Sequence, residues 1–226
     1  MTLRLVVFDV DGTLVDSQQQ ILAAMIQAFE GIGLVPPKPA AMRAIIGLSL
    51  PVAMAQLAPE AGARDHDRLA EGYRQAFVAQ RAAGGAEADA PLYPGALAAL
   101  RALAARDDTL LGVATGKSRR GLEHLLDCHD LRPFFITSQV ADDHPSKPHP
   151  SMLWQAMAET GVDAAQAVML GDTGFDMEMA RAAGVTPLGV GWGYHAPARL
   201  RDHGAVEVLA DFAELPTALE TIWRQG

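Results

Sequence analysis

Five short apolar runs recur along the chain, and turn residues bound each of them. Segments with helical spacing of apolar residues lie between and after these runs, namely Arg119–Cys128, Ser151–Thr160 and Ala213–Arg224. Short runs with few polar interruptions are typical of strands buried on both faces of a parallel sheet. Because strands alternate with helices, we predict a doubly wound parallel α/β core of Rossmann-like type. The five expected strands are Leu5–Phe8, Leu110–Ala114, Phe134–Thr137, Ala167–Leu170 and Pro187–Val190.

One long segment, residues 16–90, interrupts this alternation with helix signals and no convincing strand. Apolar residues recur at helical spacing over Ile21–Phe29, and a second helix is predicted over Arg64–Arg81. The first strand is thereby separated from the rest of its sheet. We therefore predict a small all-helical cap domain, residues 16–90, inserted after the first strand of a core domain made of residues 1–15 and 91–226.

The formal net charge of −9 makes an acidic surface that repels a nucleic-acid backbone, so we expect no nucleic-acid partner. Cys128 is the only cysteine, which allows no intrachain disulfide and favours a reducing compartment. The apolar start of the chain is cut short by acidic residues, and no uncharged stretch is long enough to span a membrane. We expect a cytoplasmic protein without a membrane partner.

The first expected strand ends in the sequence Phe8-Asp9-Val10-Asp11-Gly12-Thr13. Ligands of open α/β sheets bind at the carboxyl ends of strands, so the two carboxylates are well placed for chemistry. Gly12 permits the chain to bend and leaves backbone N–H groups available to an anion. The alternative is an ordinary turn, because Asp and Gly are common turn residues.

Three further motifs follow other strands or begin helices. Thr115-Gly116-Lys117 offers a hydroxyl and an N–H at a helix start, Lys147 lies in a proline-rich loop, and Asp172 precedes Asp176 by one helical turn. Each has a plain alternative: a helix N-cap for Thr115 or Asp172, a solvated surface lysine, and a first-turn dipole partner for Asp176. Four motifs that all suit phosphate or metal are hard to attribute to chance.

These four motifs, in this order, resemble the haloacid dehalogenase superfamily over the whole chain, helical cap included. The resemblance implies that Asp9 is a nucleophile that forms an aspartyl-phosphate and that Asp11 is the general acid and base. It implies phosphate binding by Thr115 and Lys147, to which the backbone at Gly12 and Gly116 adds N–H groups. It implies a Mg²⁺ ion held by Asp172, the Asp9 carboxylate and the Asp11 backbone carbonyl, with Asp176 as a second acidic residue outside that direct set.

The implied chemistry is physically reasonable. Each like-charge pair about 4 Å apart costs roughly 4 kcal/mol at an effective dielectric constant near 20, so a carboxylate that attacks a phosphate needs Mg²⁺ and Lys147 to offset the repulsion. Carboxylate ligands suit Mg²⁺ rather than Zn²⁺. Asp11 protonates the leaving oxygen and then deprotonates water. An aspartate at this position favours a hydrolase that turns over, although phosphomutases keep it too.

We therefore expect a phosphomonoester hydrolase that acts on a small phosphorylated metabolite. The segment Gly189–Tyr194 resembles the phosphoglycolate phosphatase branch, so phosphoglycolate is the leading candidate. A sugar phosphomutase, a pyrophosphatase and a non-enzymatic binding protein are the alternatives, and both a monomer and a homodimer fit the sequence. The segment Ile46–Ser49 resembles the substrate loop of the family's cap, and the alternative is a plain helix–helix turn. The open candidates for further substrate contacts are Arg43, Arg119, Arg120, His144 and His149.

Overall fold

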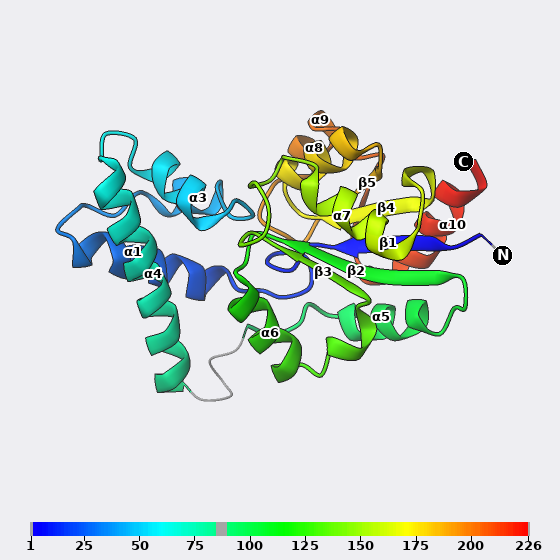
Figure 1. Ribbon diagram of the computed structural model, residues 1–226, viewed down its shortest axis with the longest axis horizontal. Coiled ribbons are helices and arrows are strands. Elements are labelled where there is room, and N and C mark those ends of the chain that lie inside the picture. The colour runs from blue at the N-terminus through cyan, green and yellow to red at the C-terminus, as the bar shows by residue number, and fades with distance from the viewer. Residues whose placement is uncertain (1, 85–89, 226) are drawn as a thin grey trace.

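A sheet of six parallel strands forms the centre of the computed structural model, which describes residues 2–84 and 90–225. The strand order is β3-β2-β1-β4-β5-β6, so β1 pairs with β2 on one side and with β4 on the other. This order confirms the doubly wound core, and it places the switch in winding direction between β1 and β4 (Figure 1). The strands are β1 Arg4–Phe8, β2 Thr109–Thr115, β3 Thr137–Val140, β4 Ala167–Gly171, β5 Thr186–Val190 and β6 Glu207–Leu209.

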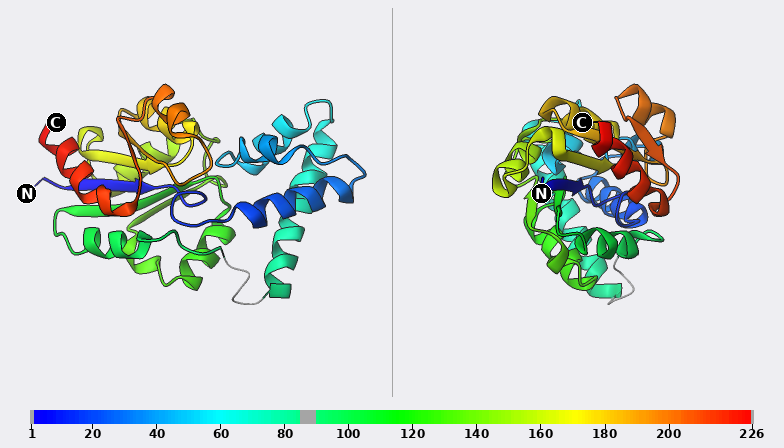
Figure 2. Two further views of the ribbon diagram at one scale, coloured as in Figure 1. Left: turned by 180° about the vertical axis from the view of Figure 1, so that it is seen from behind. Right: turned by 90° about the vertical axis from the view of Figure 1, so that its right-hand side faces the viewer.

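Two layers of helices cover the sheet, as the end-on view in Figure 2 shows. Because successive side chains of a strand point to opposite faces, Val6 and Phe8 of β1 belong to one apolar cluster, and Leu5 and Val7 belong to the other. The first cluster contains α5 Ala96–Ala104, α6 Arg119–Cys128 and α10 Leu215–Gln225, and the second contains α7 Ser151–Thr160 and α8 Gly174–Ala183. A short helix, α9 Pro197–Asp202, packs against α8.

Among the described residues 16–84, the insertion between β1 and α5 consists of helices and the turns that join them, with no strand, which confirms the predicted cap. Figure 1 shows it beside the core, at the end opposite the two chain termini. Helices α1 and α4 pack along each other, and Ile21, Met25 and Phe29 of α1 share an apolar cluster with Leu69 of α4. The cap helices are α1 Gln18–Gly31, α2 Pro39–Arg43, α3 Leu50–Leu57 and α4 Ala63–Gly84.

The chain leaves and re-enters the core at one place. Val15 forms an isolated antiparallel bridge with Leu92, so the two connections to the cap run side by side. For this reason we propose to keep the domain limits of residues 1–15 with 91–226 for the core and 16–90 for the cap. In the described part of the chain, no helix is both long enough and apolar enough to cross a membrane.

The structure differs from the sequence predictions in three places. The expected strand Phe134–Thr137 is wrong: residues Arg132–Phe134 form a 3-10 turn that begins around a proline, and the strand starts only at Thr137. The short edge strand β6 was not predicted. Helix α4 runs to Gly84, past the predicted end at Arg81, and residues 85–89 lie outside the described residues.

Candidate active site

Two carboxylates meet at the switch point of the sheet. Asp9 directly follows β1 and Asp172 directly follows β4, and these two strands are neighbours. Both side chains are buried, with 1% of Asp9 and none of Asp172 exposed to solvent. The carboxyl ends of parallel strands at such a point form the ligand-binding crevice of a doubly wound fold. The site therefore lies where the sequence predicts it.

Lys147 is buried between two of the aspartates. Its Nζ lies 2.9 Å from Oδ1 of Asp9 and 2.6 Å from Oδ1 of Asp176. Burial disfavours the charged ammonium, but the carboxylates of Asp176 and Asp9 outweigh this effect and raise the pKa of Lys147 above its usual range. Lys147 is thus a permanent cation at the base of the site, and it is not a solvated surface lysine.

Asp9, Asp172 and Asp176 together can hold a metal ion. One oxygen of each carboxylate lies within 4.8 Å of the others, and all three side chains are buried. Three carboxylates and one lysine leave two negative charges if all are ionised, which a divalent cation balances. Oδ2 of Asp9 is buried and has no hydrogen-bond partner among the described residues, which leaves an oxygen available for such an ion. The residues therefore fit a hard divalent metal such as Mg²⁺.

The crowding of carboxylates changes their acidity. Burial is the main cause that raises the pKa of Asp9 to about 7, with Lys147 opposing the rise and Asp176 and Asp11 adding to it. Burial also raises the pKa of Asp172 well above its usual range, and Asp9 and Asp176 raise it further. A metal ion relieves this repulsion, because a nearby positive charge favours the ionised form.

Asp172 is held by groups from two other loops. The hydroxyl of Thr13 donates to Oδ1 of Asp172 at 3.2 Å, and the backbone N–H of Tyr194 donates to Oδ2 at 2.8 Å. Two glycines make room for this carboxylate. A Cβ on Gly12, whose φ is 84°, or on Gly193 would lie within 2.2 Å of an Asp172 atom. The predicted role of Gly12 in binding an anion is therefore accompanied by a packing role against Asp172.

Asp176 owes its position to the start of α8. Thr173 is the N-cap residue, and its side chain accepts a hydrogen bond from the Asp176 backbone N–H. In return, Oδ2 of Asp176 accepts from the Thr173 backbone N–H at 3.0 Å. This capping box leaves Oδ1 of Asp176 for Lys147. Asp176 therefore lies in the first turn of a helix, as the alternative for this residue stated, and it also belongs to the carboxylate cluster that can hold a metal.

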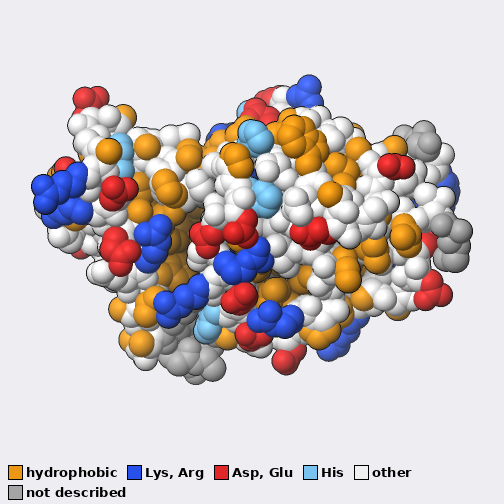
Figure 3. Space-filling view, viewed as in Figure 1, with side chains coloured by type: hydrophobic (Ala, Val, Ile, Leu, Met, Phe, Trp, Pro, Cys, Tyr) orange, Lys and Arg blue, Asp and Glu red, His pale blue; other side chains and the backbone are white. Residues whose placement is uncertain are grey.

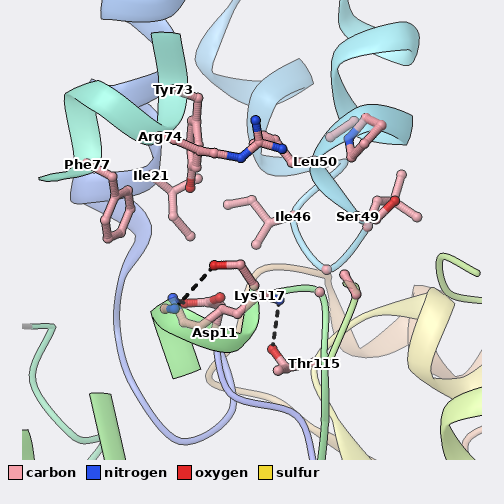
Figure 4. A pocket seen from close by; sticks show the side chains of 18 of the residues that line it. Asp11, Ile21, Ile46, Ser49, Leu50, Tyr73, Arg74, Phe77, Thr115 and Lys117 are labelled. Atoms are coloured by element: carbon pink, nitrogen blue, oxygen red, sulfur yellow. Dashed lines mark hydrogen bonds and ion pairs between the residues drawn. The ribbon is translucent and has the colours of Figure 1, made fainter. Parts of the chain in front are cut away.

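Asp11 belongs to a separate polar group on the cap side of the site. Nζ of Lys117 lies 2.8 Å from Oδ1 of Asp11 (Figure 4). The hydroxyl of Ser17 donates to the same oxygen. The Tyr194 hydroxyl is also within hydrogen-bond distance of the Ser17 hydroxyl, at 3.2 Å. The two aspartates of the first motif therefore have different partners: Asp9 contacts Lys147 and Asp11 contacts Lys117.

Thr115 is fully buried at the end of β2. Its hydroxyl oxygen accepts a weak hydrogen bond from the Lys117 backbone N–H at 3.3 Å. The N-cap of α6 is Ser118, whose side chain accepts from the Gly121 N–H. The alternative that Thr115 caps this helix is therefore wrong, and its hydroxyl stays at the floor of the site.

A cavity of about 440 Å³ lies between the core and the cap. Figure 3 shows the hollow at the junction of the two domains, with apolar side chains inside it and charged ones near its mouth. Asp9, Asp11, Thr115 and Gly116 line its floor, and residues of α1, α4 and the Ile45–Pro51 segment line its roof. The other predicted site residues are not part of this lining and surround the floor from within the core: Gly12, Lys147, Asp172 and Asp176.

The cap touches the core directly above this floor. A Cβ on Gly116 would lie 2.6 Å from the backbone oxygen of Gly47, so the two loops are in close contact. The backbone N–H of Ser49 also donates to the hydroxyl of Ser146 at 2.8 Å. The segment Ile46–Ser49 therefore lies at the site, as expected from the sequence.

The remaining candidates separate clearly. Arg120 lines the cavity, whereas Arg43, Arg119, His144 and His149 do not. The guanidinium of Arg119 donates to the Ser138 carbonyl and to Asp143. His144 lies within hydrogen-bond distance of Gln139 and Ser151, and His149 accepts from the Ser151 N–H. His144 is half-buried and His149 is exposed, and both belong to the loop that leads into α7 and do not line the cavity.

Four residues near the site were not singled out from the sequence. They are Lys117, which pairs with Asp11, Thr13 and Gly193, which surround Asp172, and Arg74 on the cavity lining. The sequence carries a recognisable signal for a different contact: the spacing Thr173-Gly174-Phe175-Asp176 is a capping-box pattern, and it fixes the Asp176 side chain. Partners such as Asp11 and Lys117 come from different strands and carry no local signal.

The contact between Gly193 and Asp172 gives a testable prediction. In Gly193→Ala, the new Cβ would lie 2.1 Å from Cβ of Asp172, so one backbone segment must shift. We expect a loss of about 1–3 kcal/mol in the free energy of unfolding and a weaker stabilisation by Mg²⁺. Denaturant unfolding with and without Mg²⁺ measures both. Gly31→Ala is the matched control, since a Cβ there meets nothing within 4 Å; equal behaviour of the two variants would contradict the close packing.

The fold and the site define a capped α/β enzyme with an acidic, metal-compatible centre at the switch point of its sheet. The model of the haloacid dehalogenase-like hydrolase family matches residues 6–190. The chain belongs to this family of hydrolases.

Similar proteins agree with this assignment. The chain is 34% identical over 220 residues to "Probable phosphatase IndB" of Dickeya dadantii, which covers 96% of this chain and 94% of that protein. It is 36% identical over 216 residues to the phosphoglycolate phosphatase of Rhodospirillum rubrum, with 94% and 89% covered. A crystal structure of a predicted phosphatase from Clostridium acetobutylicum superposes with a TM-score of 0.85 at 22% identity, covering 98% and 100% of the two chains.

Proposed function

We propose that this chain is a Mg²⁺-dependent phosphomonoester hydrolase that acts on a small phosphorylated metabolite through a phosphoryl group carried on Asp9. One observation carries the proposal. Asp9 lines the cavity with one carboxylate oxygen paired to Lys147 and the other buried without a hydrogen-bond partner among the described residues. A carboxylate at the base of a cavity can attack an electrophile with one oxygen while a cation holds the other.

The reaction is proposed to proceed in two steps on this chain's residues. First, an Asp9 oxygen bonds to phosphorus while the ester P–O bond breaks, and Asp11 gives a proton to the leaving oxygen. Water then attacks the phosphoryl-Asp9, Asp11 takes a proton from it, and Asp9 is released with inorganic phosphate. The number of bonds made equals the number broken in each step, and Asp11 returns to its starting state.

The surrounding groups have distinct parts in this scheme. Lys147 offsets the negative charge on Asp9, and we assign phosphate binding to it together with Thr115 and the backbone at Gly12 and Gly116. The proposed metal ligands are the carboxylates of Asp9 and Asp172 with the backbone carbonyl of Asp11, and Asp176 adds a third carboxylate to the cluster. When bound, Mg²⁺ supplies positive charge that lowers the repulsion between the carboxylate and the phosphate. The Lys117–Asp11 ion pair holds the proton-transferring carboxylate at the cavity floor.

Phosphoglycolate is the first compound to test, because similar proteins such as that of Rhodospirillum rubrum are named phosphoglycolate phosphatases. We expect phosphate release from phosphoglycolate or p-nitrophenyl phosphate in Mg²⁺, and a loss of at least about 100-fold in EDTA that added Mg²⁺ restores. A colorimetric phosphate assay measures it. If no phosphoester in a broad panel gave metal-dependent release, the proposal would be wrong. Isomerisation of a sugar phosphate without phosphate release, followed by NMR, would instead establish a mutase.

A further inference from the structure

The cavity roof differs from its floor in chemical character. The floor carries Asp9, Asp11 and Thr115, but the roof above Asp11 is built from Ile21, Ile46 and other apolar side chains of the cap (Figure 4). The cap contacts the core at Gly47 and Ser49, and the cavity of about 440 Å³ lies between the two domains. This volume lies in the range of about 300–1,000 Å³ that is typical of sites for drug-sized ligands.

An aromatic wall forms part of this roof. Tyr73 and Phe77, one turn apart on α4, both line the cavity, and their ring centroids are 5.6 Å apart at an interplanar angle of 38°. Nζ of Lys117 lies 5.5 Å from the centroid of the Phe77 ring, so this wall stands directly beside the Lys117–Asp11 pair. Aromatic and aliphatic side chains at this place favour an apolar body next to the leaving oxygen.

The cationic side chains on the cavity lining are not placed to bind the carboxylate of a short leaving group such as glycolate. A leaving group as small as glycolate keeps its carboxylate close to the floor of the cavity. Lys117 lies there, but its ammonium is already paired with Asp11. Arg74 and Arg120 also line the cavity, but both are exposed, and Arg74 extends across the side of the cavity farthest from Thr115 (Figure 4). A carboxylate against Ile46 and Phe77 loses water without gaining a partner, which is costly.

We propose that the leaving group of the natural substrate is an uncharged, ring-sized apolar alcohol, held between Ile46 and the rings of Tyr73 and Phe77. The inference rests on the proposed phosphatase function and specifies the substrate class of that same site. The reaction is unchanged: the ester P–O bond breaks, phosphorus passes to Asp9 and then to water, and the alcohol oxygen receives its proton from Asp11.

The test compares benzyl phosphate, methyl phosphate and phosphoglycolate in Mg²⁺. All three are esters of simple primary alcohols or methanol, so binding of the leaving group dominates the differences between them. We expect kcat/KM for benzyl phosphate to exceed that for phosphoglycolate by at least about 10-fold and that for methyl phosphate by about 100-fold. Higher or equal kcat/KM for phosphoglycolate would overturn the inference and leave the phosphatase function intact. Absence of metal-dependent release from every ester would overturn both.

Variants of the wall give a second, independent readout. Phe77→Ala should lower the benzyl-to-methyl ratio of kcat/KM by about 10-fold, and Phe77→Leu, which keeps an apolar side chain, by less. Val35→Ala, at an 88% exposed cap position that does not line the cavity, is the matched control and should leave the ratio unchanged. Thermal unfolding should show more stabilisation by benzylphosphonate than by phosphonoacetate. Equal stabilisation, or an unchanged ratio in both Phe77 variants, would overturn the inference.

Discussion

Replacing Asp9 with asparagine should lower the rate of phosphate release by at least about 10⁴-fold, because the amide is a poor nucleophile and cannot carry the phosphoryl group. The two side chains have nearly the same shape, and the asparagine oxygen can still accept the hydrogen bond that Lys147 Nζ gives to Asp9 at 2.9 Å. The loss should therefore appear in kcat with the fold preserved. Steady-state phosphate release measures it, and acid quenching with radiolabelled substrate should trap a phosphoryl adduct on the wild-type protein only.

Asp108→Asn is the matched control for this substitution. Asp108 precedes β2 and pairs with Arg4 and Arg106 at the opposite end of the sheet, away from the cavity. The same carboxylate-to-amide change there should leave turnover within about twofold of wild type, because surface ion pairs are worth little. Activity of Asp9→Asn within 10-fold of wild type, with the adduct still formed, would mean that another residue is the nucleophile.

The sequence correctly predicted the strands and helices whose apolar residues are also the ones buried in the fold. Strand β1 is buried on both faces and reads as one apolar run, whereas helices α6 and α7 each bury one continuous face, so all three match their apolar pattern. The strand after α6 was misplaced because Phe134 and Phe135 are apolar without being in the sheet: they pack against the core from the preceding turn, and Ile136 is 66% exposed. Strand β6 has three residues at the sheet edge and is partly exposed, so it shows no apolar run.

The site could be located from the sequence, but its internal pairing could not. Strand ends carry Asp9 and Asp172 to one point by topology, which sequence order predicts. The pairing of Asp11 with Lys117 depends on how two separate loops bend, and nothing within either motif specifies that contact. Asp176 lies one helical turn beyond Asp172. This spacing fits a carboxylate that binds the metal ion itself and equally one that only contacts the metal ligands. The roles of these residues in catalysis stay predictions, and Asp9→Asn tests the one assigned to Asp9.

The same cluster of carboxylates predicts an unusual dependence of stability on pH. In the metal-free protein, burial raises the pKa of Asp9 from its ordinary value of 3.8 to about 7. Between these two values the folded protein binds more protons than the unfolded chain, so its free energy of unfolding decreases as the pH rises through this window and levels off above it. The pKa rises by about three units and one unit corresponds to about 1.4 kcal/mol, so we expect a decrease of at most about 4 kcal/mol from this group.

The difference in unfolding free energy between wild type and Asp9→Asn reports this effect together with the rise in the Asp172 pKa that the Asp9 charge causes in wild type. In EDTA, wild type should lose stability relative to Asp9→Asn between about pH 4.5 and 7.5. Mg²⁺ should restore it most strongly near pH 8, where Asp9 and its neighbours Asp172 and Asp176 most need a positive charge, and it should stabilise Asp9→Asn less. Denaturant unfolding at several pH values measures these differences. A constant difference between the two proteins across this range, with equal Mg²⁺ effects, would show that Asp9 is not a strained carboxylate at a metal site.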